Sequence, residues 1–208
     1  MYTDSGQALE LPSQRGSLSC AFHEKSIPSA AVVMVGGGDG GLDGPAQAIY
    51  PTLGEDLSSR GIATLRVDFR VHQFPGDVEE AVHDILVGAR YLLHQGYQPV
   101  GVLGHSFGGA VVIEAAAREQ RLASVVTLAS QTVGAQRVVD LAPRPLLLIH
   151  GLDDTRLSPD CSKLIYGQAS EPKQLVLLKG ATHSLRQQRE VVRRLVGNWF
   201  VDTLILGR

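Results

Sequence analysis

The stretch Val100-Gly-Val-Leu-Gly-His-Ser-Phe-Gly-Gly109 decides how this chain folds. It begins with a short apolar run typical of a buried strand, and the residues after 109 are strong helix formers, so a sharp strand-to-helix turn lies between them. Residues 104–108 of that turn fit the pattern G-x-S-x-G. In this pattern a serine sits in a strained turn, and the flanking glycines let neighbouring backbone pass close by.

The turn makes the hydroxyl of Ser106 the candidate reactive group. The same geometry aims the backbone N–H of Phe107 at a negative charge that forms beside this hydroxyl. A glycine-rich loop with a solvated serine is the alternative interpretation, and this stretch alone does not decide between them. The residues that follow later strands must decide.

Size and composition indicate one soluble domain. The chain has 208 residues, of which 44% are hydrophobic, and this is enough for one sizeable core. A net charge of −2 and scattered basic residues give no reason to expect nucleic acid or an anionic membrane as a partner. The N-terminus lacks a signal pattern, and no apolar run reaches the ~20 residues that span a bilayer. We therefore expect a cytoplasmic protein.

The two cysteines predict neither a disulfide framework nor a metal site. Cys20 and Cys161 are too few for a framework, and neither has a Cys or His nearby at metal-ligand spacing. We expect two small core residues, although the sequence leaves a single bridge open. No metal or other cofactor is expected.

The chain is predicted to form a three-layer α/β/α sandwich. Residues 1–16 are polar and are expected to form a flexible N-terminal arm, and residues 17–208 a single domain. Residues 18–22 alternate as an edge strand does, whereas residues 30–35 are continuously apolar and indicate a strand buried on both faces. Asp77 and Glu80 form a capping-box pattern at the start of a helix that Gly96 ends.

The other predicted elements continue the alternation of strands and helices. They are a short helix before residue 61, a strand at 62–69, a helix to about 119, a strand at 123–128, an irregular segment at 130–142, a strand at 145–149, a helix at 160–168, a strand at 174–178 and a helix from about 185. This order predicts a mainly parallel sheet of about seven or eight strands, with the site beyond their carboxyl ends.

A glycine-rich loop, Gly36-Gly-Gly-Asp-Gly-Gly41, follows the strand at 30–35. Five glycines in six residues rule out regular structure here, so the backbone turns tightly or approaches something closely. Phosphate binding is one interpretation, but the loop lacks the Lys-Ser/Thr ending of a P-loop.

Two further loops can supply the partners that a reactive serine needs. Serine is a poor nucleophile near neutral pH, so it requires a base within hydrogen-bonding reach, and the base requires an orienting carboxylate. The loop His150-Gly-Leu-Asp-Asp154 follows one predicted strand, and Gly180-Ala-Thr-His183 follows the next. Serine, acid and histidine then occur in the order found when such a triad is built on an open α/β sheet.

Together these motifs resemble the α/β-hydrolase fold family, over nearly the whole chain from about Ser17 to Phe200. In this family the acid commonly lies four residues after the histidine of His-Gly-x-x-Asp, which implies Asp154, with Asp153 as the second choice. Asp154 could instead cap the helix that begins near Pro159, and His183 could be a solvated loop residue. His150 and His105 flank the expected site, and we interpret both as structural.

The resemblance implies a cofactor-independent serine hydrolase without a large lid, in the compact dienelactone-hydrolase-like and small serine esterase branch. Ser106 would cleave a small-molecule carboxylic ester or thioester, with His183 as base and Asp154 as its orienting acid. The oxyanion hole would consist of the Phe107 N–H and a second N–H, from Gly38 or Asp39. Dienelactone hydrolases use a cysteine where this chain has serine, so their substrate does not carry over. The alternative function is a binding or receptor module that turns over slowly or not at all, and the oligomeric state is left open.

Overall fold

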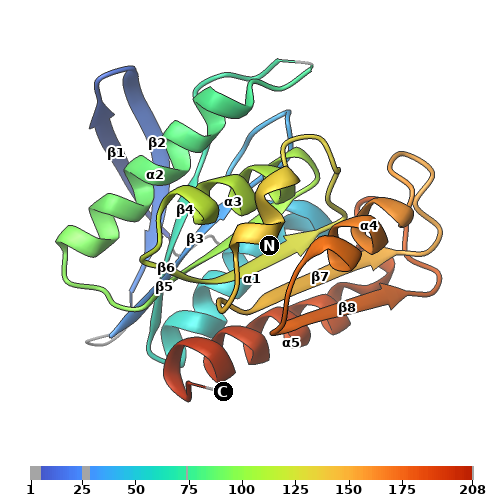
Figure 1. Cartoon of the computed structure of the whole chain (residues 1–208). Coiled ribbons are helices and arrows are strands. Elements are labelled where there is room, and N and C mark those ends of the chain that lie inside the picture. Colours follow the sequence, from blue (N-terminus) through green and yellow to red (C-terminus); the bar gives the residue numbers. More distant parts are fainter. Residues whose placement is uncertain (1–5, 25–28, 74, 208) are drawn as a thin grey trace.

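A mainly parallel sheet runs through the centre of the computed structural model (Figure 1), which describes residues 6–24, 29–73 and 75–207. Within these residues the sheet has eight strands in the order β1-β2-β4-β3-β5-β6-β7-β8. Strands β1, β2 and β4 pair antiparallel, and all pairs from β4 through β8 are parallel. The strands are β1 Gln7–Ser13, β2 Gly16–His23, β3 Ala30–Val35, β4 Ile62–Val67, β5 Val100–His105, β6 Leu122–Leu128, β7 Leu146–Gly151 and β8 Lys173–Leu178.

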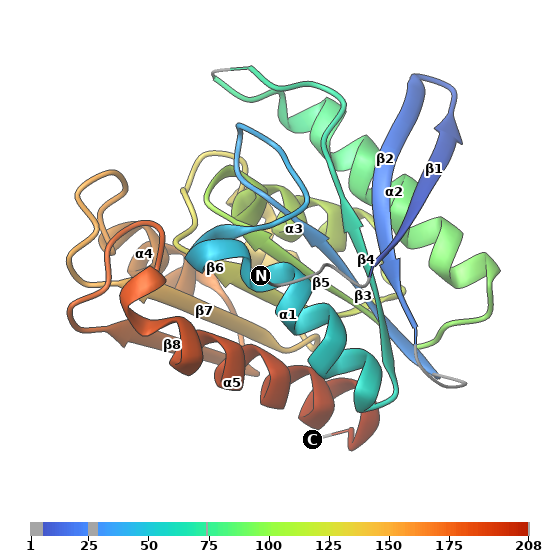
Figure 2. The same cartoon turned by 180° about the vertical axis from the view of Figure 1, so that it is seen from behind.

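Helices cover both faces of the sheet, as the sequence predicts. Helices α2, α3 and α4 share one apolar core with the sheet, and α1 and α5 share the other, which faces the reader in Figure 2. The helices are α1 Pro45–Ser59, α2 Val78–His94, α3 Phe107–Arg118, α4 Asp160–Gln168 and α5 Arg189–Phe200, with 3-10 segments η1 Gln136–Asp140 and η2 Arg186–Gln188 and a π segment η3 Val201–Ile205. Across the described part of the chain, no helix combines the length and the apolar composition that crossing a bilayer requires.

The link between β6 and β7 carries no large lid. Its regular structure in the described residues is the short segment η1, which packs against α3 and α4. The fold is therefore the lidless α/β/α sandwich that the sequence predicts, and the carboxyl ends of the strands are not covered by an inserted domain.

The prediction of a flexible arm is wrong for residues 7–13. These residues form β1, an edge strand that pairs with β2 along its whole length, with Leu9 opposite Cys20 and Leu11 opposite Leu18. Leu11 is 5% exposed, because it packs into the core beside the sheet. The predicted edge strand at 18–22 is consequently an inner strand. Residues 1–5 of the predicted arm lie outside the described residues.

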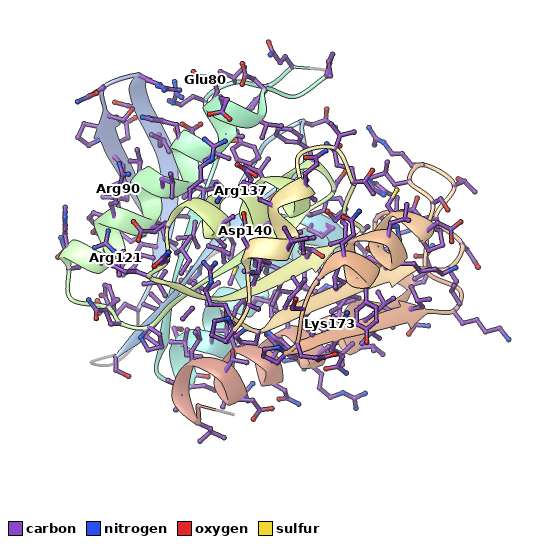
Figure 3. The ribbon with its side chains drawn as sticks, viewed as in Figure 1. Glu80, Arg90, Arg121, Arg137, Asp140 and Lys173 are labelled. Carbon is purple, nitrogen blue, oxygen red and sulfur yellow. The ribbon has the colours of Figure 1, made fainter. Side chains whose placement is uncertain are left out.

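The predicted start of α2 is confirmed, but only half of the capping box forms. Asp77 Oδ1 accepts the backbone N–H of Glu80 at 3.1 Å, which satisfies a helix N-terminal donor. The Glu80 carboxylate does not return to Asp77. It forms ion pairs with Arg15 and Arg70 instead, near the N-terminal end of α2 (Figure 3), and so joins the β1–β2 turn to this helix.

The first turn of α1 is left-handed. Ala46, Gln47 and Ala48 have φ of 54°, 57° and 59°, and the right-handed helix begins only after them. A left-handed conformation costs an L-residue about 1–2 kcal/mol, because Cβ crowds the following carbonyl oxygen. The preceding residue, Gly44, also has a positive φ, of 69°. Only glycine fits at this position, because a Cβ would lie 2.4 Å from the Tyr50 ring.

We predict that Gln47→Gly stabilises the protein by about 1 kcal/mol, because glycine adopts the left-handed region without the Cβ penalty. Gln47 is exposed, so little packing is lost. The control is Arg90→Gly, an exposed position in the right-handed helix α2 (Figure 3), which should destabilise by about 1 kcal/mol. Urea unfolding measures both changes, and a destabilising Gln47→Gly would contradict the prediction.

Candidate active site

Ser106 lies in the sharp turn between β5 and α3 that the sequence predicts. Its φ of 56° and ψ of −116° are strained for a residue with a side chain, and its N–H donates to Leu128 O at 2.8 Å. The flanking glycines are required by contact. A Cβ on Gly104 would lie 2.1 Å from Gly108 O, and a Cβ on Gly108 would lie 2.1 Å from Gly36 O.

The structure brings the three predicted side chains together in one hydrogen-bonded series. Ser106 Oγ lies 3.0 Å from His183 Nε2, and His183 Nδ1 lies 2.7 Å from Asp154 Oδ2. The three residues follow β5, β7 and β8, whose carboxyl ends meet at the same edge of the sheet. The His183 side chain is 14% exposed, so its ring is accessible from this edge.

Asp154 rather than Asp153 holds the histidine. Asp153 is exposed, whereas the side chain of Asp154 is buried and each of its oxygens accepts two hydrogen bonds. Oδ1 accepts the N–H groups of Arg156 and Leu157 at 2.8 and 2.9 Å, and Oδ2 accepts from two imidazoles. Both carboxylate oxygens are occupied by these four donors, and the N-terminus of α4 has no side-chain cap, so Asp154 does not cap this helix.

This set of donors keeps Asp154 ionised. Burial acts to raise the pKa of the carboxyl, but the Leu157 N–H and His183 outweigh it, so the pKa lies below its usual value. A fully bonded carboxylate with a lowered pKa can stabilise a positive imidazole without taking its proton.

His150 is in direct contact with Asp154, which the sequence analysis did not anticipate. The buried His150 Nε2 lies 3.1 Å from Asp154 Oδ2 and 3.1 Å from Leu157 O. Both atoms are acceptors, so Nε2 carries the proton, and Nδ1 accepts from the buried Ser162 hydroxyl at 2.7 Å. Burial lowers the pKa of His150, so the ring stays neutral. Its place four residues before Asp154 was the available signal.

His105 supports the loop that carries His183. Its Nε2 donates to His183 O at 3.2 Å, and the two rings lie 4.9 Å apart. Burial, with a smaller contribution from the nearby His183, lowers the pKa of His105 from 6.5 to about 4. A neutral ring with its proton on Nε2 fits the structural role that we predict for it.

The glycine-rich loop folds back on itself beside Ser106. Gly40 N–H donates to Gly37 O at 3.0 Å, and an ideal Cβ on Gly37 would lie 3.6 Å from Ser106 Cβ. A Cβ on Gly38 would lie 4.0 Å from Phe107 Cβ, whereas Asp39 is exposed at the tip. The end of the loop is fixed, because Gly41 N–H donates to Asp68 Oδ1 at 2.6 Å.

Neither cysteine takes part in this site. Cys20 and Cys161 are both free, and only Cys20 is fully in the core, where burial raises the pKa of its thiol to about 12. Among the residues that the structure describes, no three His, Cys, Asp or Glu side chains are grouped as a metal ion would need.

Comparison with known proteins identifies the family. The model of a family described as "Alpha/beta hydrolase family" matches residues 32–167, so the chain belongs to the α/β-hydrolase family. The uncharacterized protein YfhR of Escherichia coli (strain K12) is 29% identical over 109 residues, which are 41% of this chain and 38% of that protein. The match therefore spans well under half the length of this curated relative.

Solved structures share the fold over almost the whole chain. Dienelactone hydrolase from Anabaena variabilis superposes with a TM-score of 0.82 at 21% identity, covering 96% of this chain and 98% of its own. Est1E from Butyrivibrio proteoclasticus superposes with a TM-score of 0.80 at 19% identity, covering 95% and 98%. At these identities the likeness establishes the fold only, so the activity must be argued from the residues of the site.

We predict that His105 makes the protein less stable in acid. The pKa of His105 is lower in the folded state than in the unfolded state. Its contribution to the free energy of unfolding is therefore complete above the unfolded pKa of 6.5 and is lost as the pH falls toward about 4. The shift corresponds to about 3 kcal/mol. His105→Gln should flatten the fall in unfolding free energy between about pH 7 and about pH 4 in urea titrations. The control is His94→Gln, on the exposed end of α2, whose unfolding free energy should vary with pH as that of the parent does. Parallel curves of unfolding free energy against pH for the parent and His105→Gln would contradict the prediction.

Proposed function

We propose that the chain is a serine hydrolase that cleaves a carboxylic ester or thioester through an acyl-enzyme on Ser106. The observation that carries the proposal is the series of two hydrogen bonds from Ser106 Oγ through His183 to Asp154, at 3.0 and 2.7 Å. A hydroxyl, an imidazole and an ionised carboxylate in this order activate a serine for attack on an acyl carbon.

Acylation uses the proton relay in one direction. As Ser106 Oγ attacks the carbonyl carbon, its proton passes to His183 Nε2, which then donates it to the departing alcohol or thiol. Asp154 Oδ2 accepts the Nδ1–H of His183, so it selects the tautomer whose Nε2 is free to take the proton. It also stabilises the imidazolium that forms. In deacylation, His183 activates a water that releases the acid.

The developing oxyanion would be bound by backbone donors. Phe107 N–H is the first donor after the nucleophile and lies at the N-terminus of α3, where the helix dipole favours negative charge. The Phe107 ring packs edge-on against Phe69 at 5.8 Å, which fixes this peptide. The backbone N–H of Gly38, which lies beside Phe107, is proposed as the second donor. Loss of one such donor costs about 2.7–4 kcal/mol of transition-state stabilisation.

The proposed substrates are small esters. The described fold has no large lid, so a small acyl group can reach Ser106 at the carboxyl ends of the strands. Among the proteins of the same fold, one is named a dienelactone hydrolase, and Est1E is described with ferulic acid bound. Short aryl and alkyl esters, and the matching thioesters, are therefore the first compounds to test.

We predict that Ser106→Ala abolishes covalent labelling by a fluorophosphonate and lowers ester turnover by a factor on the order of 10⁴ or more. The hydroxyl contributes little packing, so the unfolding free energy should stay within about 0.5 kcal/mol of the parent. The measurements are labelling followed by mass spectrometry and burst kinetics with a p-nitrophenyl acyl ester. Retained labelling would identify another nucleophile, and a parent that binds the ester without a burst would favour the binding-module alternative.

We predict that Asp154→Asn lowers turnover by about 10⁴-fold, because the amide supplies a donor where His183 needs an acceptor. The matched control is Asp153→Asn, an exposed neighbour in the same loop, which should change turnover by less than about twofold. Steady-state kinetics of both variants decide the assignment, and the reverse ranking would move the acid to Asp153.

A further inference from the structure

The loop that carries His183 is held by two consecutive backbone carbonyls. His183 O accepts from the His105 ring, and Ser184 O accepts the backbone N–H of Ala46 at 2.8 Å. The next residue, Leu185, is fully buried in the left-handed region at φ 57°. The position of the His183 imidazole therefore depends on a segment that lies far away in the sequence, between β3 and α1.

The left-handed turn 46–48 presents Ala46 to this loop. The N–H of Ala46 points to Ser184, and its C=O accepts Arg189 Nε at 3.0 Å. The same guanidinium donates through Nη2 to Thr52 Oγ1 at 2.7 Å. Arg189, at the start of α5, thus joins the strained turn to the right-handed part of α1, which contains Thr52.

The same segment is continuous with the glycine-rich loop. Gly41 is bound to Asp68, the backbone of Asp43 accepts the N–H of Tyr50 at 3.0 Å, and the buried Tyr50 hydroxyl donates to Val35 O at 2.7 Å. These bonds fix the chain at both ends of the loop. The loop proposed to bind the oxyanion and the loop that carries the proposed base therefore share one support.

Local sequence does not favour this turn. Three successive non-glycine residues in the left-handed region each carry a steric penalty, and such strain persists only where the surroundings impose it. Here the bonds from Ala46 to Ser184 and to Arg189 impose it.

We propose that the turn 46–48 and Arg189 form a positioning clamp that fixes the His183 loop relative to Ser106. This inference rests on the proposed function. Arg189 is a positioning residue, because its side-chain hydrogen bonds go to Ala46, Thr52 and Glu190 and not to the reacting groups. Loss of the clamp spreads the imidazole over misaligned positions, which lowers kcat while leaving KM unchanged.

The test compares Arg189→Ala with Arg193→Ala. Both arginines lie on α5 and both join it to α1, but Arg193 does so through an ion pair with Asp56 and not through the turn. Arg189→Ala should lower kcat for a p-nitrophenyl ester by about 10- to 100-fold with KM within about twofold. The low-field proton resonance of His183 Nδ1–H should weaken or shift. Arg193→Ala should leave kcat within about twofold and the resonance unchanged.

Equal effects of the two substitutions, or an unaltered kcat and resonance in Arg189→Ala, would overturn the clamp. If Arg189→Ala fails to fold, Thr52→Val removes one acceptor of the guanidinium at nearly constant shape. It should reduce kcat in the same direction by a few-fold, and an unchanged kcat and resonance in this variant overturn the proposal. The resonance also separates the two proposals, because it reports the position of His183 even if the parent protein hydrolyses no ester.

Discussion

The close approach of three backbone segments at the turn that carries Ser106 is the constraint on which the site depends. Gly104, Gly108 and Gly36 meet with no room for a Cβ on the first two, so the end of β5, the start of α3 and the end of β3 pack backbone to backbone. Ser106 is forced into its strained conformation by this contact and by its bond to Leu128. Ser106, the first N–H of α3 and the glycine-rich loop consequently form one unit, which would hold the proposed nucleophile and oxyanion donors in fixed positions.

His105, His150 and Asp154 surround this unit, and among these three residues only Asp154 carries a fixed charge. His105 and His150 are kept neutral by burial, and each uses its one N–H on an acceptor of the network. Asp154 is the ionised member, and each of its oxygens is satisfied by two donors. In the proposed mechanism, the negative charge of Asp154 is therefore in place, with its hydrogen-bond donors already oriented, before His183 becomes positive. Such preorganisation needs no rearrangement at the moment of proton transfer.

Local patterns were enough to predict most of the fold and the three converging side chains. The apolar run of β3, the cap at Asp77 and the G-x-S-x-G turn each depend on neighbours in sequence. The features that the sequence did not predict depend on partners that are distant in the chain. Strand β1 forms because it pairs with β2 and because Leu11 packs into the core, and the contact of His150 with Ser162 joins β7 to α4. Alanine and glutamine at 46–48 carry no signal of a left-handed turn, since bonds to residues 184 and 189 create it.

The choice of residues in that turn follows from what a support must do. Glycine enters the left-handed region without penalty, but it also populates a broad range of other conformations at positive φ. For residues with a Cβ the left-handed well is small, and the observed φ values of 54°, 57° and 59° fall inside it. Once distant bonds force alanine and glutamine into this well, their backbone has little freedom left. A turn built in this way is less stable than a glycine turn, but it holds Ser184, and with it the imidazole, within a narrower range of positions.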